Sequence, residues 1–237
     1  MRTDVMAEMA STPTHSGPDV AGPRRLTRHL VPVLGVAGVL LTMTGLGGVG
    51  DAPAPDDTAE SMASHFKLVH DDVLIAAPIG IIGAAALGAF LLGLARRLRA
   101  AGESGAATAV TSGGSIAVGY LLFLHLSYAA LVYQIADTSA EATKALFVIT
   151  ILAMPVVGLG IALTLGGAAY GAGRARLLPR WWTVATVAGA AFAAIAIFSY
   201  AAEDFFSPDV QQQTAFGAFV IWILVTAGAL FARGRRS

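Results

Sequence analysis

Long apolar stretches separated by short polar loops dominate the pattern of this chain. Six stretches, each long enough to cross a bilayer, lie at about residues 30–50, 73–95, 112–135, 145–170, 181–202 and 213–232. A helix needs about 20 mostly apolar residues to cross the roughly 30 Å hydrocarbon core. The stretches are apolar all round, whereas barrel strands alternate over about ten residues. The pattern predicts an all-α fold, a polytopic membrane bundle of six transmembrane helices.

Composition adds the surroundings that this bundle requires. The 237 residues are 56% hydrophobic and 13% charged, with a mean hydropathy of +0.70, whereas soluble domains are about 25% charged. The lipid bilayer is therefore the expected partner. The net charge of zero at pH 7 is a cancellation between two polarised faces, so we expect no nucleic-acid partner. The chain has no cysteine, which excludes disulfides and thiolate chemistry.

Basic residues occupy alternate loops. All but Lys67 and Lys144 of the 15 Lys and Arg residues lie before the first span, after the second, after the fourth or after the sixth. The remaining loops carry the carboxylates Asp51, Asp56, Asp57, Glu60, Asp71, Asp72, Asp137, Glu141, Glu203, Asp204 and Asp209. By the positive-inside rule, we expect a multi-pass protein of the plasma (inner) membrane with both termini in the cytoplasm.

The same pattern divides the chain into three segments. Residues 1–29 predict a disordered cytoplasmic tail, 30–232 the transmembrane domain, and 233–237 a basic cytoplasmic tail. The arginines before the first span and the small residues after it also resemble a signal peptide with its cleavage site. The apolar run is longer than a normal signal core and no Ala-x-Ala directly follows it, which favours a retained first span.

The loop before the second span predicts a short external amphipathic helix. Asp57 and Glu60 have capping-box spacing, and Met62, Phe66 and Val69 then fall on one helical face. One interpretation is a stem that leads into the bilayer.

The other interpretation makes the histidines of this loop functional. His65, His70, Asp71 and Asp72 would then be metal ligands or a pH-sensitive lid. His65 and His70 are five residues apart, about 140° around a helix, and do not share a face. The spacing favours the stem, so no metal ion and no cofactor is expected.

Small residues at four-residue spacing predict close helix packing. They are Gly80, Ala84 and Gly88 in the second span, and Ala185, Gly189 and Ala193 in the fifth. Such faces favour contacts within the bundle, with a membrane protein partner or a homo-oligomer as the alternative. Trp181 and Trp182 follow Arg180 and predict an interfacial aromatic belt.

Pro155 predicts a kink in the fourth span. A proline removes one backbone donor and leaves the carbonyl of Ile151 without its helical partner. Transporters use broken helices to bind ions, but usually as a pair in two repeats. No second break is evident in this chain, which favours a structural kink.

His125 lies near the centre of the third span and is the ionisable residue set deepest in the apolar pattern. Intramembrane ionisable groups are costly and suggest a functional site. Tyr128 lies one turn further along. The candidate hydrogen-bond partners are Thr42, Thr44, Thr150, Thr164 and the Ile151 carbonyl. A structural imidazole is the favoured interpretation. The alternative is a ligand or proton site of His125, Tyr128 and Pro155.

An outer polar mouth would accompany such a site. Its residues would be His70, Asp71 and Asp72 before the second span, and Glu203 and Asp204 after the fifth. These carboxylates would attract a cation toward the outer surface.

Several membrane chemistries find no support in the motifs. The sequence has no HExxH, no GxSxG and no Walker phosphate loop. A single buried histidine cannot supply two haem ligands. A retinal protein needs a buried lysine for its Schiff base, and neither lysine lies within a span. We therefore expect no enzymatic activity. Two hypotheses stay open: a non-enzymatic structural or accessory membrane subunit, or a small transporter or ligand and pH sensor.

A family resemblance rests on three short segments. They are His70-Asp71-Asp72, the run Leu-Ala-Arg-Arg-Leu-Arg at 94–99, and Leu178-Pro179-Arg180-Trp181. With these the chain resembles a loose group of uncharacterised six-helix integral membrane proteins of high-GC Gram-positive bacteria, over about residues 30–235. The resemblance implies six spans and brings no activity and no site residue.

Overall fold

The computed structural model describes residues 22–133, 138–198 and 208–234. Within these ranges the chain is helical, without strands. The elements are α1 (Gly22–Gly47), α2 (Ala59–Leu68), α3 (His70–Ala100), α4 (Ser104–Tyr133), α5 (Ala140–Leu152), α6 (Pro155–Arg174), α7 (Arg180–Ile195), the 3-10 helix η1 (Ala196–Phe198) and α8 (Pro208–Gly234).

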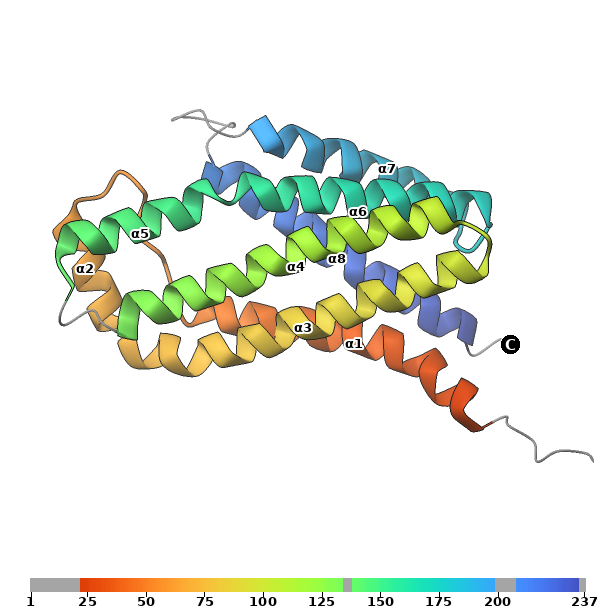
Figure 1. Cartoon of the computed structure of the whole chain (residues 1–237), viewed down its shortest axis with the longest axis horizontal. Coiled ribbons are helices and arrows are strands. Elements are labelled where there is room, and N and C mark those ends of the chain that lie inside the picture. Colours follow the sequence, from red (N-terminus) through yellow and green to blue (C-terminus); the bar gives the residue numbers. More distant parts are fainter. Residues whose placement is uncertain (1–21, 134–137, 199–207, 235–237) are drawn as a thin grey trace, which may run out of the picture.

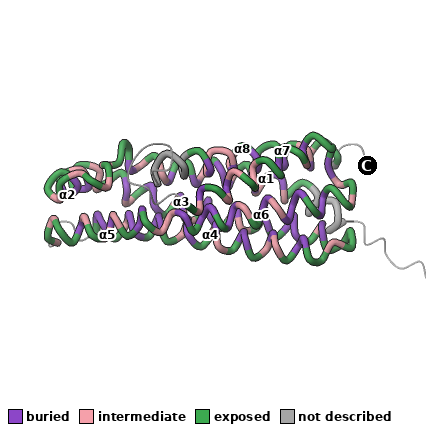
Figure 2. The backbone as a smooth tube through the Cα atoms, turned by 90° about the horizontal axis from the view of Figure 1, so that it is seen from above, coloured by how far each residue is buried: buried purple, intermediate pink, exposed green. Residues whose placement is uncertain are grey.

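The helices form one elongated bundle whose long members run side by side (Figure 1). α1 packs mainly on α3, α3 on α4, α4 on α6, and α6 on α7, while α8 packs on α1 and also touches α6 and α7. Figure 2 shows buried positions on the facing sides of the helices and exposed positions pointing outward. The predicted α-helical bundle is confirmed.

Six segments of the described chain are long and apolar enough to cross a membrane, as predicted. They are His29–Gly47, His70–Ala100, Ser104–Tyr133, Ala140–Arg174, Arg180–Phe198 and Thr214–Arg233. Two helices begin eight residues earlier than the apolar pattern indicates. α1 already begins at Gly22, within the stretch assigned to the tail. α4 begins at Ser104, because Ala106, Ala107 and Val110 bury their small side chains in the bundle.

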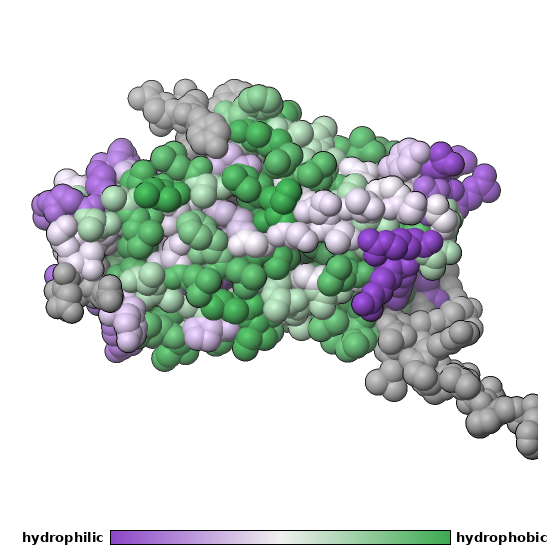
Figure 3. Space-filling model, viewed as in Figure 1, coloured by the Kyte–Doolittle hydropathy of each residue, from purple (hydrophilic) through white to green (hydrophobic). Residues whose placement is uncertain are grey.

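The two ends of the bundle differ in charge, and an apolar belt separates them (Figure 3). The start of α1, the α3–α4 and α6–α7 turns and the end of α8 form the basic end, which carries Arg96, Arg97, Arg174 and Arg233. α2, the start of α3, the end of α4 and the start of α5 form the acidic end.

The predicted short helix before the second span exists as α2, but its cap differs from the prediction. The hydroxyl of Thr58 accepts the Ser61 N–H at 3.2 Å and is the N-cap. Asp57, the predicted cap, instead accepts the N–H of Ala54 at 3.0 Å and closes the preceding turn. A threonine one residue later competes successfully for the same role.

α2 closes the acidic end of the bundle. Its Met62 and Phe66 are fully buried, and the Phe66 ring lies 6.3 Å from Tyr128 and 5.7 Å from Phe147, measured between centroids. Lys144 on α5 donates to the backbone carbonyl of Asp57 at 2.6 Å. α2 is therefore an amphipathic cap packed on α4 and α5.

The predicted break at Pro155 separates α5 from α6. Pro155 has no N–H, and the carbonyl of Ile151 accepts the Met154 N–H at 2.9 Å instead. Met154 is thereby withdrawn from Thr150, the residue four positions before it. The Thr150 carbonyl accepts the hydroxyl of Tyr120 from α4, at 3.0 Å. The Met154 N–H thus replaces the missing Pro155 N–H at the Ile151 carbonyl. The Tyr120 hydroxyl, from a neighbouring helix, replaces the Met154 N–H at the Thr150 carbonyl.

The small residues of α3 permit close packing, with one change from the predicted set. Gly80 and Ala84 are buried, and a methyl group at Gly80 would overlap the ring of His125. A methyl group at Gly88 would meet no atom closer than 3.6 Å. Gly83 continues the close approach instead, because a methyl group there would overlap the backbone of α1.

The predicted small face of the fifth span divides between two environments. Ala193 is buried against Gly158 of α6, whereas Ala185 is exposed. Glycines bring α4 and α6 close together. A methyl group at Gly113 would sit 2.6 Å from the Gly160 carbonyl oxygen.

Reciprocal tryptophan–threonine hydrogen bonds join α7 to α8. The indole N–H of Trp182 donates to the Thr226 hydroxyl at 3.0 Å, and that of Trp222 donates to Thr186 at 3.1 Å. Trp182 is only 1% exposed and is not part of an interfacial belt, whereas Trp181 is 61% exposed, as such a belt requires. Adjacent side chains of a helix point about 100° apart, so the two indoles of this Trp-Trp pair differ in burial.

Candidate functional site around His125

Three helices meet at the His125 side chain. The residue lies on α4, and its ring fills the space left by Gly80 on α3, next to Gly45 on α1. A methyl group at Gly45 would lie 2.7 Å from Nε2 of the ring and would overlap Gly80. His125 itself is 0% exposed. Two glycines on two helices therefore form a fitted slot for the imidazole.

The slot lies away from the middle of the helix. His125 is about 10 Å beyond the mid-point of α4, at 1.5 Å per residue, and Gly45 is in the last turn of α1. The sequence predicts His125 at the centre of its span because the polar first residues of α4 are not recognisable as membrane helix, so the predicted span begins only at residue 112. The residue instead belongs to the half of the bundle nearer the acidic end.

The hydrogen bonds of His125 indicate its tautomer. Nδ1 lies 2.7 Å from the carbonyl oxygen of Leu121 on the same helix. A carbonyl only accepts, so Nδ1 carries the proton, and in a neutral ring Nε2 is an acceptor. Nε2 has no hydrogen-bond partner, and neither has the buried hydroxyl of Thr42 on α1. The predicted hydrogen bond between the His125 ring and the Thr42 hydroxyl is therefore not made.

The other predicted partners lie elsewhere. The hydroxyls of Thr44, Thr150 and Thr164 each donate to the carbonyl four residues earlier in the chain, and the Ile151 carbonyl accepts the Met154 N–H. The Ile151 carbonyl therefore does not serve His125, whose Nδ1 pairs with the Leu121 carbonyl.

The proposed trio of His125, Tyr128 and Pro155 is divided between α4 and α6. Tyr128 follows one turn after His125, but its ring packs against Phe66 of the α2 cap. Pro155 begins α6 and is buried in the bundle. No described contact joins the proline to the histidine.

The predicted outer polar mouth is only partly within the described residues. Nδ1 of His70 lies 2.8 Å from a carboxylate oxygen of Asp71, whose side chain is 92% exposed, and Asp72 is exposed beside it in the first turn of α3. Glu203 and Asp204 lie outside the described residues.

The two loop histidines are held apart by different partners. His65 is bonded through Nε2 to the backbone carbonyl of Val49, at 3.0 Å, whereas His70 pairs with its neighbour Asp71. Among residues 22–133, 138–198 and 208–234, no group of three or more His, Asp or Glu side chains is arranged to hold a metal ion.

Sequence reasoning missed Tyr120, Gly45 and the Trp–Thr pairs. Tyr120 lies five residues before His125 on α4 and shows no distinguishing spacing. A signal for Gly45 did exist, since Gly38 and Gly45 are seven residues apart on one face of α1, as close helix packing requires.

A cavity of about 760 Å³ lies at the basic end, bounded by α1, α3, α8 and the α6–α7 turn. His125 does not line it. The candidate site is thus closed by packed side chains, and the principal hollow of the basic end is separate from it.

The six apolar helices, the apolar belt and the two charged ends define a multi-pass integral membrane protein. Comparisons with protein-family models, with curated proteins and with solved structures find no match.

Proposed function

We propose that this protein is a non-enzymatic accessory subunit of the plasma membrane, with both termini in the cytoplasm, which associates with another integral membrane protein. The observation that carries the proposal is the burial of His125. The most polar group of the interior is fully enclosed between two glycines and bonded to its own helix. Such a group specifies helix packing and has no route to a substrate.

The outer face of α7 is the proposed contact with the partner helix. α7 buries the smallest share of its span, 22% against 33–50% for the other five. Val184 and Val187 are 70% and 55% exposed, and the small residues Ala185, Ala188 and Ala191 of the same helix are exposed as well. Small residues let a second helix approach closely in lipid, where packing is the main driving force.

Site-directed photo-crosslinking tests this association. The chain has no cysteine, so Ala188→Cys carries the one thiol to which a benzophenone maleimide can be attached in native membranes. We expect one crosslinked product of defined mass. A product at twice the mass of the chain identifies the partner as a second copy.

Ile82→Cys on α3 is the matched control, because Ile82 is 60% exposed on a different helix. It should give no discrete product. Equal crosslinking at both positions, or none at Ala188, would contradict an interface on α7.

A small transporter or pH sensor is the second candidate, and one observation favours it. Nε2 of His125 and the hydroxyl of Thr42 are buried without partners, and unsatisfied buried polar groups are rare outside functional sites. Protonation of His125 would supply a donor at Nε2. A pH-dependent flux in proteoliposomes that His125→Gln abolishes, with melting unchanged, would establish this function, since glutamine cannot titrate.

A further inference from the structure

The cavity at the basic end opens between α1, α3 and α8, and most of its wall is apolar. Leu30, Leu34, Leu94 and Leu230 are among the residues that line it. Leu30 and Leu92, at its rim, are 50% and 46% exposed on the belt that faces the hydrocarbon. The cavity is therefore a groove that an acyl chain can enter sideways from the bilayer.

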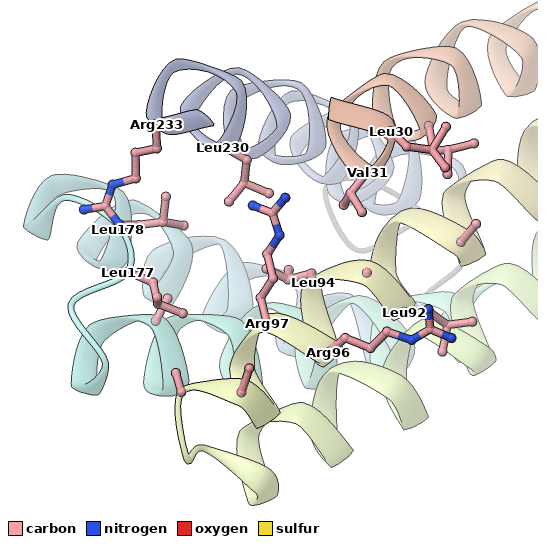
Figure 4. Close-up of a pocket in the computed structure, with 16 residues that line it drawn as sticks. Leu30, Val31, Leu92, Leu94, Arg96, Arg97, Leu177, Leu178, Leu230 and Arg233 are labelled. Atoms are coloured by element: carbon pink, nitrogen blue, oxygen red, sulfur yellow. The ribbon is translucent and has the colours of Figure 1, made fainter. Parts of the chain in front are cut away.

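Three arginines belong to the same groove. Arg96 and Arg97 come from the end of α3 and Arg233 from the end of α8, and no carboxylate is among the 16 described residues that line it. Figure 4 shows the Arg97 side chain projecting into the space between α1 and α8, near Leu230 and Val31. Arg233 reaches from the other side toward Leu178 and donates to the Arg176 carbonyl at 3.4 Å.

The combination of an apolar wall and an arginine mouth identifies the chemistry of the occupant. Arginine binds phosphate oxygens through parallel N–H donors and keeps its charge at any physiological pH. The leucine wall offers no polar partner to a water-soluble anion, but it matches an acyl chain. Basic pockets between transmembrane helices at a membrane surface bind anionic lipid headgroups for the same reason.

We propose that this groove is a binding site for one anionic phospholipid, with an acyl chain along the α1, α3 and α8 wall and the phosphate between Arg97 and Arg233. The lipid fills a gap between the ends of helices that are distant in the sequence. It holds the end of α8 against the rest of the basic end.

Native mass spectrometry of the full chain in detergent tests the site with defined lipids. Dioleoyl phosphatidylglycerol and dioleoyl phosphatidylcholine have the same acyl chains and differ in headgroup charge. We expect one phosphatidylglycerol to be retained at least tenfold more strongly than phosphatidylcholine. Arg97→Gln should weaken its binding about fivefold, and Arg97→Gln with Arg233→Gln about 25-fold.

Arg99→Gln is the matched control. Arg99 lies two residues from Arg97 on α3, outside the groove, and its guanidinium reaches Thr111 at 3.4 Å. It should leave the affinity unchanged. Equal losses for Arg97→Gln and Arg99→Gln would overturn the proposal, because they would mean general attraction to a basic surface.

Two further outcomes distinguish other occupants. Glycerol phosphate, which has the anionic group without acyl chains, should not displace the lipid at millimolar concentration, and displacement would mean a simple anion site. Absence of lipid binding to the full chain, with binding gained when residues 1–20 are removed, would overturn the proposal in favour of the N-terminal segment. All variants alter exposed or half-exposed arginines, and a melting curve for each confirms folding.

Discussion

At the scale of single residues, glycines provide the space that the buried imidazole of His125 occupies. The His125 ring occupies space that any side chain at Gly80 would take. Its position therefore depends on two glycines from other helices more than on its own hydrogen bond. This arrangement explains how an imidazole can be enclosed in a membrane protein without a charged partner.

A double-mutant cycle measures this fit. Gly80→Ala should lower the free energy of unfolding by about 1–3 kcal/mol, because the added methyl group collides with the His125 ring. In the background of His125→Ala the same change should cost less than about 0.5 kcal/mol, since the ring is gone. Gly88→Ala, with 3.6 Å of room, is the control and should be neutral. Melting in detergent gives all four values, and additive losses would refute the slot.

Thr42 gives a second prediction of opposite sign. Its hydroxyl is buried without a partner, and an unsatisfied buried hydroxyl costs about 1–3 kcal/mol. Thr42→Val, which removes the hydroxyl and keeps the branched shape, should therefore melt at or above the temperature of the unaltered chain.

Thr186→Val is the comparison for Thr42. The Thr186 hydroxyl accepts from Trp222 and donates to the Trp182 carbonyl. Its loss should lower stability by about 1–3 kcal/mol, because the indole N–H of Trp222 is then buried unpaired. The same melting measurement compares both, and destabilisation by Thr42→Val would show that its hydroxyl has a partner in the membrane.

At the scale of elements, the broken fourth span is stabilised from outside itself. The Tyr120 hydroxyl on α4 takes up the Thr150 carbonyl that the α5–α6 break leaves free. The break therefore also fixes how α4 and α5 lie against each other. The kink thus has its cause in Pro155 and a compensating hydrogen bond from a neighbouring helix.

Tyr120→Phe tests the compensation. The change should cost about 0.5–1.5 kcal/mol of stability, the net value of one buried hydrogen bond. In a Pro155→Ala background, residue 155 can again donate to Ile151 and Met154 to Thr150, so the tyrosine change should cost clearly less. Thermal melting of the four proteins provides the comparison. An equal cost in both backgrounds would separate Tyr120 from the break.

The periodic and compositional features of these elements could be predicted from the sequence, and the contacts between elements could not. Six apolar runs are a property of continuous segments, and so are the amphipathic α2 and the break at Pro155. The partner of Thr150 depends instead on which residue of α4 lies opposite α5. Trp182 and Thr226 are separated by 44 residues in the sequence, so no local sequence pattern can predict their hydrogen bond. The sequence indicates His125 as a single candidate residue. The slot that Gly45 and Gly80 form around its ring depends on how three helices pack, which no local pattern shows.

At the scale of the whole molecule, the charge distribution orders the bundle. The described arginines of the α3–α4 turn, the α6–α7 turn and the end of α8 lie at the basic end, and the carboxylates of α2 and α3 lie at the opposite end beyond the apolar belt (Figure 3). This polarity predicts that the basic end faces the cytoplasm.

Reporter fusions test the orientation. An alkaline phosphatase fused at residue 105 or at the C-terminus should be inactive, because this reporter needs the oxidising exterior. A fusion near Asp57 should be active. Activity at residue 105 would reverse the proposed orientation.

Packed side chains seal the interior around His125, and the solvent access of position 42 measures this seal. Thr42→Cys places a thiol of similar size beside the histidine in a chain that has no other cysteine. We expect no reaction of this thiol with a membrane-impermeant methanethiosulfonate reagent in sealed vesicles of either orientation. Asp71→Cys, at a 92% exposed side chain, should react completely from one side. Rapid labelling of Thr42→Cys would contradict the sealed bundle and favour a water-filled path to His125.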